Sequence, residues 1–106
     1  MKGIWTLICS YGRIFMRFVH EENEILLYNN EEKICAGVKF PTVKDGIVNV
    51  TSTYVNKEME GQGIAGKLMM ELVSNMKNTN RKAITTCTYA RNWFSRHPEY
   101  QDIIIK

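Results

Sequence analysis

Few cysteines and no long apolar run set the first limits on this 106-residue chain. The three cysteines are odd in number and widely separated, which excludes a metal-site spacing and argues against a disulfide framework. A reducing, cytoplasmic compartment is therefore expected. No apolar stretch approaches the length that spans a bilayer, and the first residues lack the long apolar region of a signal peptide. We expect neither a membrane segment nor a secretory signal.

Strong charge of either sign is also missing. The net charge of +3 is too small to argue for a nucleic-acid partner. The basic residues are not massed, apart from a loose group that either covers a solvated face or meets a phosphate: Lys77, Arg81, Lys82, Arg91 and Arg96. The length suits a single core. We expect residues 1–15 to form an N-terminal extension and residues 16–106 to form one compact domain.

What the chain does have is a glycine-rich loop, with Gly61 and Gly63, followed by one long amphipathic segment. Apolar residues recur there with the period of a helix that buries one face: Ile64, Ala65, Leu68, Met69, Leu72, Val73 and Met76. Residues 47–55, just before the loop, are rich in β-branched types and predict a strand. A strand–loop–helix unit directs free backbone N–H groups and the positive helix end at one point. An anion such as a pyrophosphate can bind there.

Three other interpretations of the loop fit its residues to different degrees. Two glycines before a helix can simply make a tight turn, and this alternative stays open. A P-loop requires Ser or Thr after its lysine, but Lys67 is followed by Leu68. Gly61, Gly63 and Gly66 match the G-x-G-x-x-G pattern of a dinucleotide-binding fingerprint. However, the loop follows several strands, and no acidic residue is available for a ribose.

The flanking segments predict a mixed sheet. Strands are expected over residues 14–20, 24–28 and 33–40, and the short turns between them make an antiparallel meander. Residues 82–87 predict a strand parallel to the one that ends at Val55, because a helical crossover joins the two. A short helix over residues 89–97, stopped by Pro98, and a final strand over residues 102–105 follow. The expected fold class is α+β, with a meander, a parallel strand–helix–strand unit and a short C-terminal helix.

Three stretches, in order and at this spacing, resemble the GCN5-related N-acetyltransferase (GNAT) superfamily, and most closely its compact subgroup. They are Thr53-Tyr54-Val55, the loop from Glu60 to Ala65, which is similar to the acetyl-CoA loop Q/R-x-x-G-x-G/A, and Cys87-Thr88-Tyr89-Ala90 with Arg96-His97-Pro98-Glu99-Tyr100. The similarity covers residues 16–106. The chain departs from the pattern at Glu60, where Gln or Arg is usual, and at Ser52, where the subgroup commonly has a histidine.

The resemblance implies acetyl-CoA as cofactor and an unidentified amine as acceptor, either a small molecule, a peptide or a protein. The strands that end at Val55 and Cys87 would splay apart and hold the pantetheine, with the Val55 N–H facing the thioester oxygen. The implied cofactor contacts are Tyr54, Val55, Glu60, Gly61, Gln62, Gly63, Ile64, Ala65, Gly66, Lys67, Cys87 and Arg91.

Two residues are candidates for catalysis. Cys87 is either a thiolate that accepts the acetyl group or contacts the cofactor, or else a small buried hydrophobe. Tyr89 either donates to the leaving thiolate or is a core aromatic residue. His97 lies too far along the helix to pair with Cys87 and is expected to serve the turn at Pro98. Trp93 and Phe94 are expected in the core.

Two functions from different classes remain. The first is an acetyl-CoA-dependent N-acetyltransferase in which the amine attacks directly within a ternary complex. The second is a module that binds CoA or an acyl-CoA with little or no turnover. A nucleic-acid-binding domain rests only on mild basicity and ranks last, and no membrane partner is expected.

Overall fold

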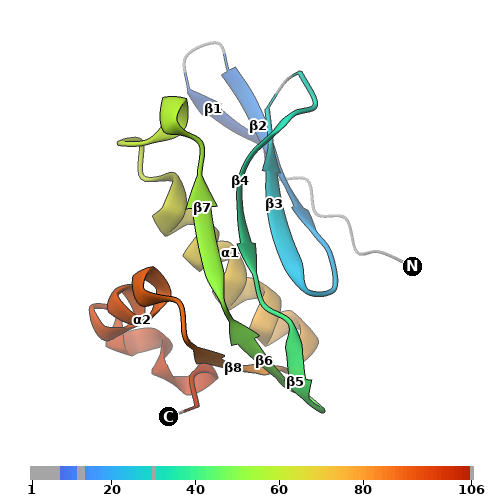
Figure 1. The fold of residues 1–106 in the computed structure, drawn as a ribbon, viewed down its shortest axis with the longest axis vertical. Coiled ribbons are helices and arrows are strands. Elements are labelled where there is room, and N and C mark those ends of the chain that lie inside the picture. The colour runs from blue at the N-terminus through green and yellow to red at the C-terminus, as the bar shows by residue number, and fades with distance from the viewer. Residues whose placement is uncertain (1–7, 12–13, 30, 106) are drawn as a thin grey trace.

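The computed structural model describes residues 8–11, 14–29 and 31–105, and its strands form two sheets (Figure 1). A five-stranded antiparallel sheet has the order β1-β2-β3-β4-β7, and a three-stranded sheet has the order β5-β6-β8, in which β6 and β8 are parallel. The bounds are β1 Ile8–Tyr11, β2 Ile14–His20, β3 Glu24–Tyr28, β4 Ile34–Lys39, β5 Thr42–Lys44, β6 Ile47–Val50, β7 Ser52–Val55 and β8 Lys82–Thr85. The predicted α+β class, with its meander and parallel unit, is confirmed.

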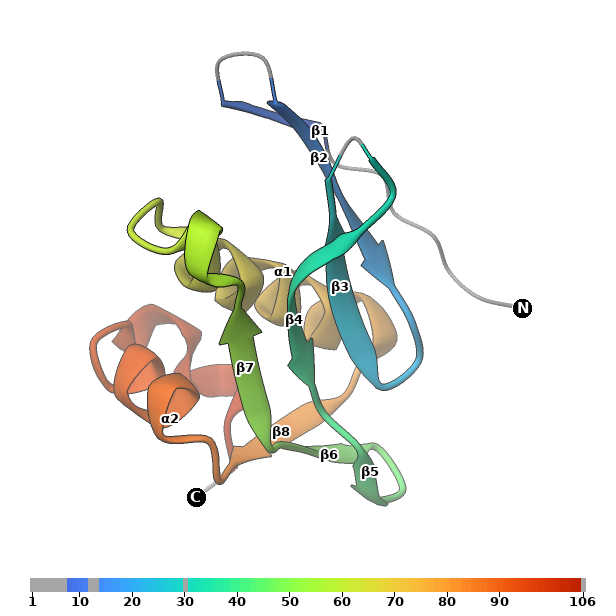
Figure 2. The same cartoon turned by 45° about the horizontal axis from the view of Figure 1, so that its top comes forward.

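In the residues described, two α-helices and two 3₁₀-helices complete the fold. They are η1 Lys57–Met59, α1 Ile64–Thr79, α2 Thr88–Ser95 and η2 Pro98–Ile103. Helix α1 lies across one face of the five-stranded sheet, behind β7, β4 and β3 in Figure 1, and α2 lies beside β7 (Figures 1 and 2). The opposite face of β3, β4 and β7 carries no helix among the described residues.

The hydrophobic core lies between α1 and the sheet. The predicted apolar stripe of α1 is buried, except that Ala65 in the first turn is only partly buried. Facing it are alternate residues of the paired strands: Phe18, Ile25, Leu27, Ala36 and Val38. Each fully buried Leu, Ile or Phe of this kind stabilises the fold by about 1.5–3 kcal/mol relative to an exposed position. The start of α1 is therefore fixed against the sheet by the turns that follow it.

A polar group also joins the sheet to α1. His20 is buried, and its Nε2 lies 2.7 Å from Glu71 Oε1 while its Nδ1 lies 2.8 Å from Asn75 Nδ2. Arg81 can only donate, so Asn75 Oδ1 accepts its hydrogen bond at 2.8 Å and the amide nitrogen of Asn75 must donate to His20. The histidine consequently carries its proton on Nε2 and donates it to Glu71. Glu71 is partly buried in this contact.

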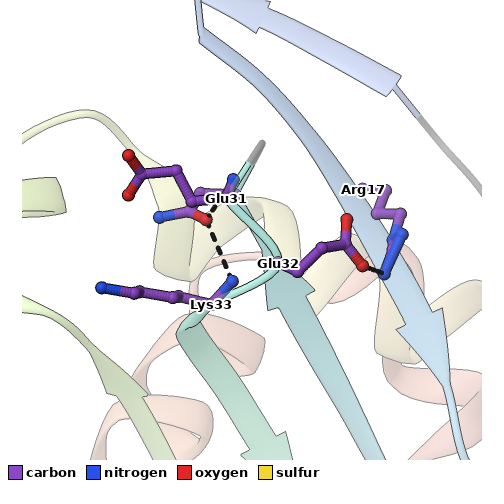
Figure 3. Close-up of polar contacts among 5 residues, drawn as sticks. Arg17, Glu31, Glu32 and Lys33 are labelled. Atoms are coloured by element: carbon purple, nitrogen blue, oxygen red, sulfur yellow. Dashed lines mark hydrogen bonds and ion pairs between the residues drawn. The ribbon is translucent and has the colours of Figure 1, made fainter.

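The side chain of Asn29 organises the β3–β4 turn (Figure 3). Its side-chain oxygen accepts the N–H of Glu31 at 2.9 Å and that of Lys33 at 3.0 Å, and Glu32 takes the left-handed conformation at φ 62°. Arg17 of β2 forms an ion pair with Glu32. The pair is largely exposed, so it contributes little to stability.

Several predicted boundaries are wrong. The run over residues 47–55 is not one strand, because Thr51 divides it into β6 and β7, which belong to different sheets. The strand predicted to reach Cys87 ends at Thr85, and α2 begins at Thr88 with Cys87 as its N-cap. The final strand over residues 102–105 is absent. In its place η2 runs to Ile103, and Ile104 makes a single parallel bridge with Ala83.

The predicted N-terminal extension overlaps the sheet. β1 pairs with β2 in an antiparallel register, with Ile8 opposite Arg17. The division of the chain at residue 16 stays a prediction.

Candidate functional site

The glycine loop turns twice through the left-handed region before α1 begins. Gly61 has φ 83° and Gly63 has φ 74°, conformations that side chains disfavour. A Cβ built on either glycine would meet nothing within 4 Å. The requirement for glycine is therefore conformational and does not come from crowding.

The first turn of α1 presents backbone donors. Its first intrahelical hydrogen bond runs from the Lys67 N–H to the Gly63 carbonyl at 3.2 Å, so the N–H groups of residues 64–66 precede the ladder. Gly63 is the N-cap, and no side chain caps this helix end. With the positive end of the helix dipole, these donors form a site suited to an anion.

The strand before the loop leaves one edge unpaired. β6 and β8 pair through Val50 and Thr85, after which β7 pairs with β4 instead. Asn56 donates its N–H to the Cys35 carbonyl at 2.8 Å. Because alternate residues of a strand direct their backbone groups to opposite edges, the N–H of Val55 points away from β4 toward the side where α2 lies. The predicted separation of the two strands is confirmed.

These parts meet in one hollow of about 160 Å³, which we call the loop pocket. It is lined by Val55, Met59, Glu60, Gly61, Gly63, Ile64, Ala65, Gly66 and Tyr89. The end of β7, the glycine loop, the first turn of α1 and the first turn of α2 thus face one another. A hollow of this volume suits a pyrophosphate. A whole nucleotide thioester is longer, so the rest of that molecule would have to lie along the open edge of β7.

Tyr89 is the aromatic residue of the loop pocket. Its hydroxyl lies 4.0 Å from the position that a Cβ on Gly66 would occupy, so it reaches the first turn of α1. Burial raises the pKa of Tyr89; the Arg96 guanidinium opposes this increase and Cys87 adds to it. A phenol with a raised pKa keeps its proton at neutral pH and can donate a hydrogen bond.

Cys87 lies just behind this pocket, not on its wall. The thiol is 9% exposed and its Sγ donates to Thr53 Oγ1 at 3.6 Å, across the gap between α2 and β7. Cys87 is therefore close to β7. Both of its roles, nucleophile or contact, stay predictions.

Besides Cys87, four of the implied cofactor residues do not line the loop pocket. Gln62 and Lys67 are exposed on the loop and on the first turn of α1. Tyr54 points to the sheet face away from α1, and its ring lies across Gly37, where a Cβ would be 2.5 Å from the hydroxyl oxygen. Arg91 donates to the Thr85 carbonyl at 3.3 Å and lines a different cavity, at the edge of β8. As placed, Arg91 does not reach the loop pocket.

The aromatic residues of α2 behave as expected. Trp93 and Phe94 are buried in the core. The His97 ring stacks on Trp93 with centroids 3.8 Å apart, and His97 Nδ1 lies 2.7 Å from the Trp93 carbonyl oxygen, so Nδ1 donates this bond. Its ring is fixed at the turn before Pro98.

Two residues of the site had no assigned role. Met59 is buried at the end of η1 and anchors the loop, and Thr53 accepts the hydrogen bond from Cys87. Met59 could have been predicted as an anchor of the loop, because it is an apolar residue just before the glycines. Nothing in a β-branched strand distinguishes Thr53.

Other site types find no support in the described part of the chain. Among those residues no group of three or more His, Cys, Asp or Glu side chains could hold a metal ion. None of the helices described is long and apolar enough to cross a bilayer.

A mixed sheet that opens beside a glycine loop and a helix start is the architecture of N-acetyltransferases, and comparison with known proteins agrees. Residues 17–103 match the family model described as GCN5-related N-acetyl-transferase, so the chain belongs to this family. No curated protein matches it.

Solved structures show the same fold. The solution structure of a GCN5-like protein from Staphylococcus aureus is similar with a TM-score of 0.68 and 26% identity, over 84% of this chain and 87% of that one. A crystal structure of an acetyltransferase of the GNAT family from Staphylococcus aureus Mu50 has a TM-score of 0.50 and 16% identity, over 74% of this chain and 49% of that one. The second likeness concerns the fold alone.

Proposed function

We propose that this chain transfers the acetyl group of acetyl-CoA to an amine, by direct attack of the amine within a ternary complex. The observation that carries the proposal is the loop pocket, in which unpaired backbone donors at the start of α1 face Val55 and Tyr89. The acceptor, a small amine or an amine of a peptide or protein, is left open. We also infer a reducing compartment, because Cys35 and Cys87 are buried free thiols.

The residues present fit the cofactor. The N–H groups of residues 64–66 would hold the pyrophosphate, and the open edge of β7 would pair with the pantetheine amides as an added strand does. Lys67 is on the exposed side of the first turn and would add a charge contact. When bound, the thioester supplies an activated acyl group.

The chain's own groups would then act at three atoms. The Val55 N–H would donate to the thioester oxygen as negative charge develops on it. The Tyr89 hydroxyl, which like any tyrosine hydroxyl is protonated at neutral pH, would donate to the leaving sulfur. Water or a backbone carbonyl would take the amine proton. Much of the acceleration would come from positioning.

A binding module with little turnover is the second candidate, and one observation favours it. Among the residues that line the loop pocket, Glu60 and Tyr89 are the only ionisable ones, so no histidine is available as a base. Glu60 also lines the loop pocket, and a carboxylate near the phosphates would disfavour their binding.

Two measurements decide between these functions. Calorimetric titration with acetyl-CoA should give a dissociation constant in the micromolar range or below, on the order of −8 kcal/mol. Incubation with acetyl-CoA and a panel of polyamines, lysine peptides and N-terminal peptides should release CoA and give an acetylated product. Tight binding without thiol release from any member would support the module. The absence of binding would contradict both functions.

A further inference from the structure

A second hollow, which we call the edge cavity, lies at the free side of β8. Its volume is about 440 Å³, which is within the range of small-molecule sites. It is lined by four apolar residues, Ile84, Phe94, Ile104 and Ile105, and by four polar ones, Thr85, Arg91, Ser95 and Gln101. It shares no lining residue with the loop pocket.

The strand edge that borders this cavity is incompletely paired. β8 is bonded to β6 on its other side, where Lys82 and Thr86 donate to the carbonyls of Gly46 and Val50. On the cavity side, Ile105 donates to the Ala83 carbonyl at 2.8 Å, and the bridge with Ile104 is the last pairing described there. Since backbone groups alternate along a strand, the N–H of Thr85 points to this free edge.

A cation lies at the same point. Arg91 Nη2 donates to the Thr85 carbonyl at 3.3 Å, a long bond that occupies one of the five N–H groups of the guanidinium. Among the described residues Arg91 forms no ion pair, and no carboxylate lines the edge cavity. One positive charge and a backbone donor thus stand at the rim of a largely apolar hollow.

We propose that the edge cavity binds a small carboxylate with a compact apolar body. The carboxylate would accept hydrogen bonds from the free N–H groups of Arg91 and from Thr85, and the apolar body would lie against Ile84 and Ile104. A planar guanidinium matches a carboxylate in a two-bond geometry, which a neutral amide cannot reproduce. The site is separate from the one assigned to acetyl-CoA.

The test uses the whole chain, labelled with ¹⁵N, and two probes of equal shape: 3-phenylpropionate and its neutral amide. The carboxylate should shift the amide signals of Ile84, Thr85 and Ile104, with a dissociation constant on the order of 1 mM or lower. The amide should bind at least about fivefold more weakly, because hydrogen bonds to a charged acceptor are the stronger ones. Equal binding of the two probes, or signal shifts only elsewhere, would overturn the proposal.

Three variants of exposed arginines sharpen the result. Arg91→Gln should bind the carboxylate as weakly as the amide, and Arg91→Lys should recover part of the difference. Arg96→Gln is the matched control, since Arg96 is exposed on the end of the same helix but does not line the cavity. An equal loss in Arg91→Gln and Arg96→Gln would show a general charge effect and contradict the assignment.

Titration of Arg91→Gln with acetyl-CoA separates this proposal from the expectation that Arg91 binds a phosphate. If the variant binds acetyl-CoA within about twofold of the parent chain's affinity, Arg91 does not contact the cofactor, as the proposal requires. A loss of about tenfold or more would show that Arg91 contacts the cofactor and would contradict the proposal. If acetyl-CoA binds no form of the chain, the proposed function fails while the carboxylate titration still decides the edge cavity.

Discussion

The loop pocket and the edge cavity are built from different atoms. At the loop pocket the donors are main-chain N–H groups at the start of α1, held by two left-handed glycines. At the edge cavity the charge is one side chain, Arg91, beside a free strand edge. Affinity at the loop pocket should therefore depend on backbone conformation, and affinity at the edge cavity on the identity of one residue.

The largest effect is expected when the backbone of the loop is changed. Gly63→Val forces a β-branched residue into a conformation with φ 74°, so the loop should rearrange and move its N–H groups. We expect acetyl-CoA affinity to fall at least about tenfold, together with a loss of stability of about 1–2 kcal/mol. Calorimetry and thermal unfolding measure the two effects.

Gly46→Val is the matched control. Gly46 has φ 78° and, like Gly63, no atom within 4 Å of a built Cβ, but it lies in the turn between β5 and β6. It should lose similar stability and keep its affinity. Unchanged acetyl-CoA binding by Gly63→Val would exclude the loop as the phosphate site.

The next effect concerns Tyr89. Tyr89→Phe removes the hydroxyl but not the ring, so turnover should fall about 10- to 100-fold while acetyl-CoA affinity changes little. Because burial raises the pKa of Tyr89, its active protonated form persists to high pH, and the parent rate should decline only at a pH above the ordinary range of a tyrosine. The variant should lack this alkaline decline in a rate–pH profile.

Tyr100→Phe serves as the comparison, because Tyr100 stacks on Trp93 and does not line the loop pocket. Equal rates for parent and Tyr89→Phe, or an equal loss in Tyr100→Phe, would assign Tyr89 to packing alone.

Local pattern predicted the elements of the loop pocket, and long-range pairing decided the rest. The stripe from Ile64 to Met76 and the short turns of the meander depend on neighbours in sequence, and both were found. The break at Thr51 is different. It lies within an unbroken β-branched run, and it exists because the two halves of the run pair with different sheets.

The edge cavity was beyond prediction for the same reason. The resemblance implied a phosphate contact for Arg91. Helical spacing puts Arg91 about 200° around α2 from Tyr89, so the two residues face different sides. What Arg91 faces is known only from the structure, because the cavity wall includes Ile104, whose bridge to Ala83 joins residues 21 positions apart.

A smaller effect is expected at Cys87. If the amine attacks directly, Cys87→Ala should keep turnover within about fivefold, since only a thiol near the open edge of β7 is lost. Intact-protein mass spectrometry after mixing the parent with acetyl-CoA should show no acetyl adduct. Cys35→Ala is the control, because burial raises the pKa of that thiol and it donates to the Leu27 carbonyl away from the site. An adduct that disappears only in Cys87→Ala would replace direct attack by a covalent route.

The smallest effect is expected from Glu60, and it tests the comparison most directly. Glu60→Gln removes a carboxylate from the wall of the loop pocket. Two like charges about 7 Å apart in water repel by about 0.6 kcal/mol, so acetyl-CoA affinity should rise about two- to threefold at low ionic strength. The gain should shrink as salt is added, because ions screen exposed charges.

Glu58→Gln is the control, because Glu58 lies on η1 and outside the pocket wall, and its gain in acetyl-CoA affinity should be smaller. If Glu60→Gln instead weakens binding, the carboxylate must hold the loop in shape, and a side chain as well as the backbone would then determine affinity at the loop pocket.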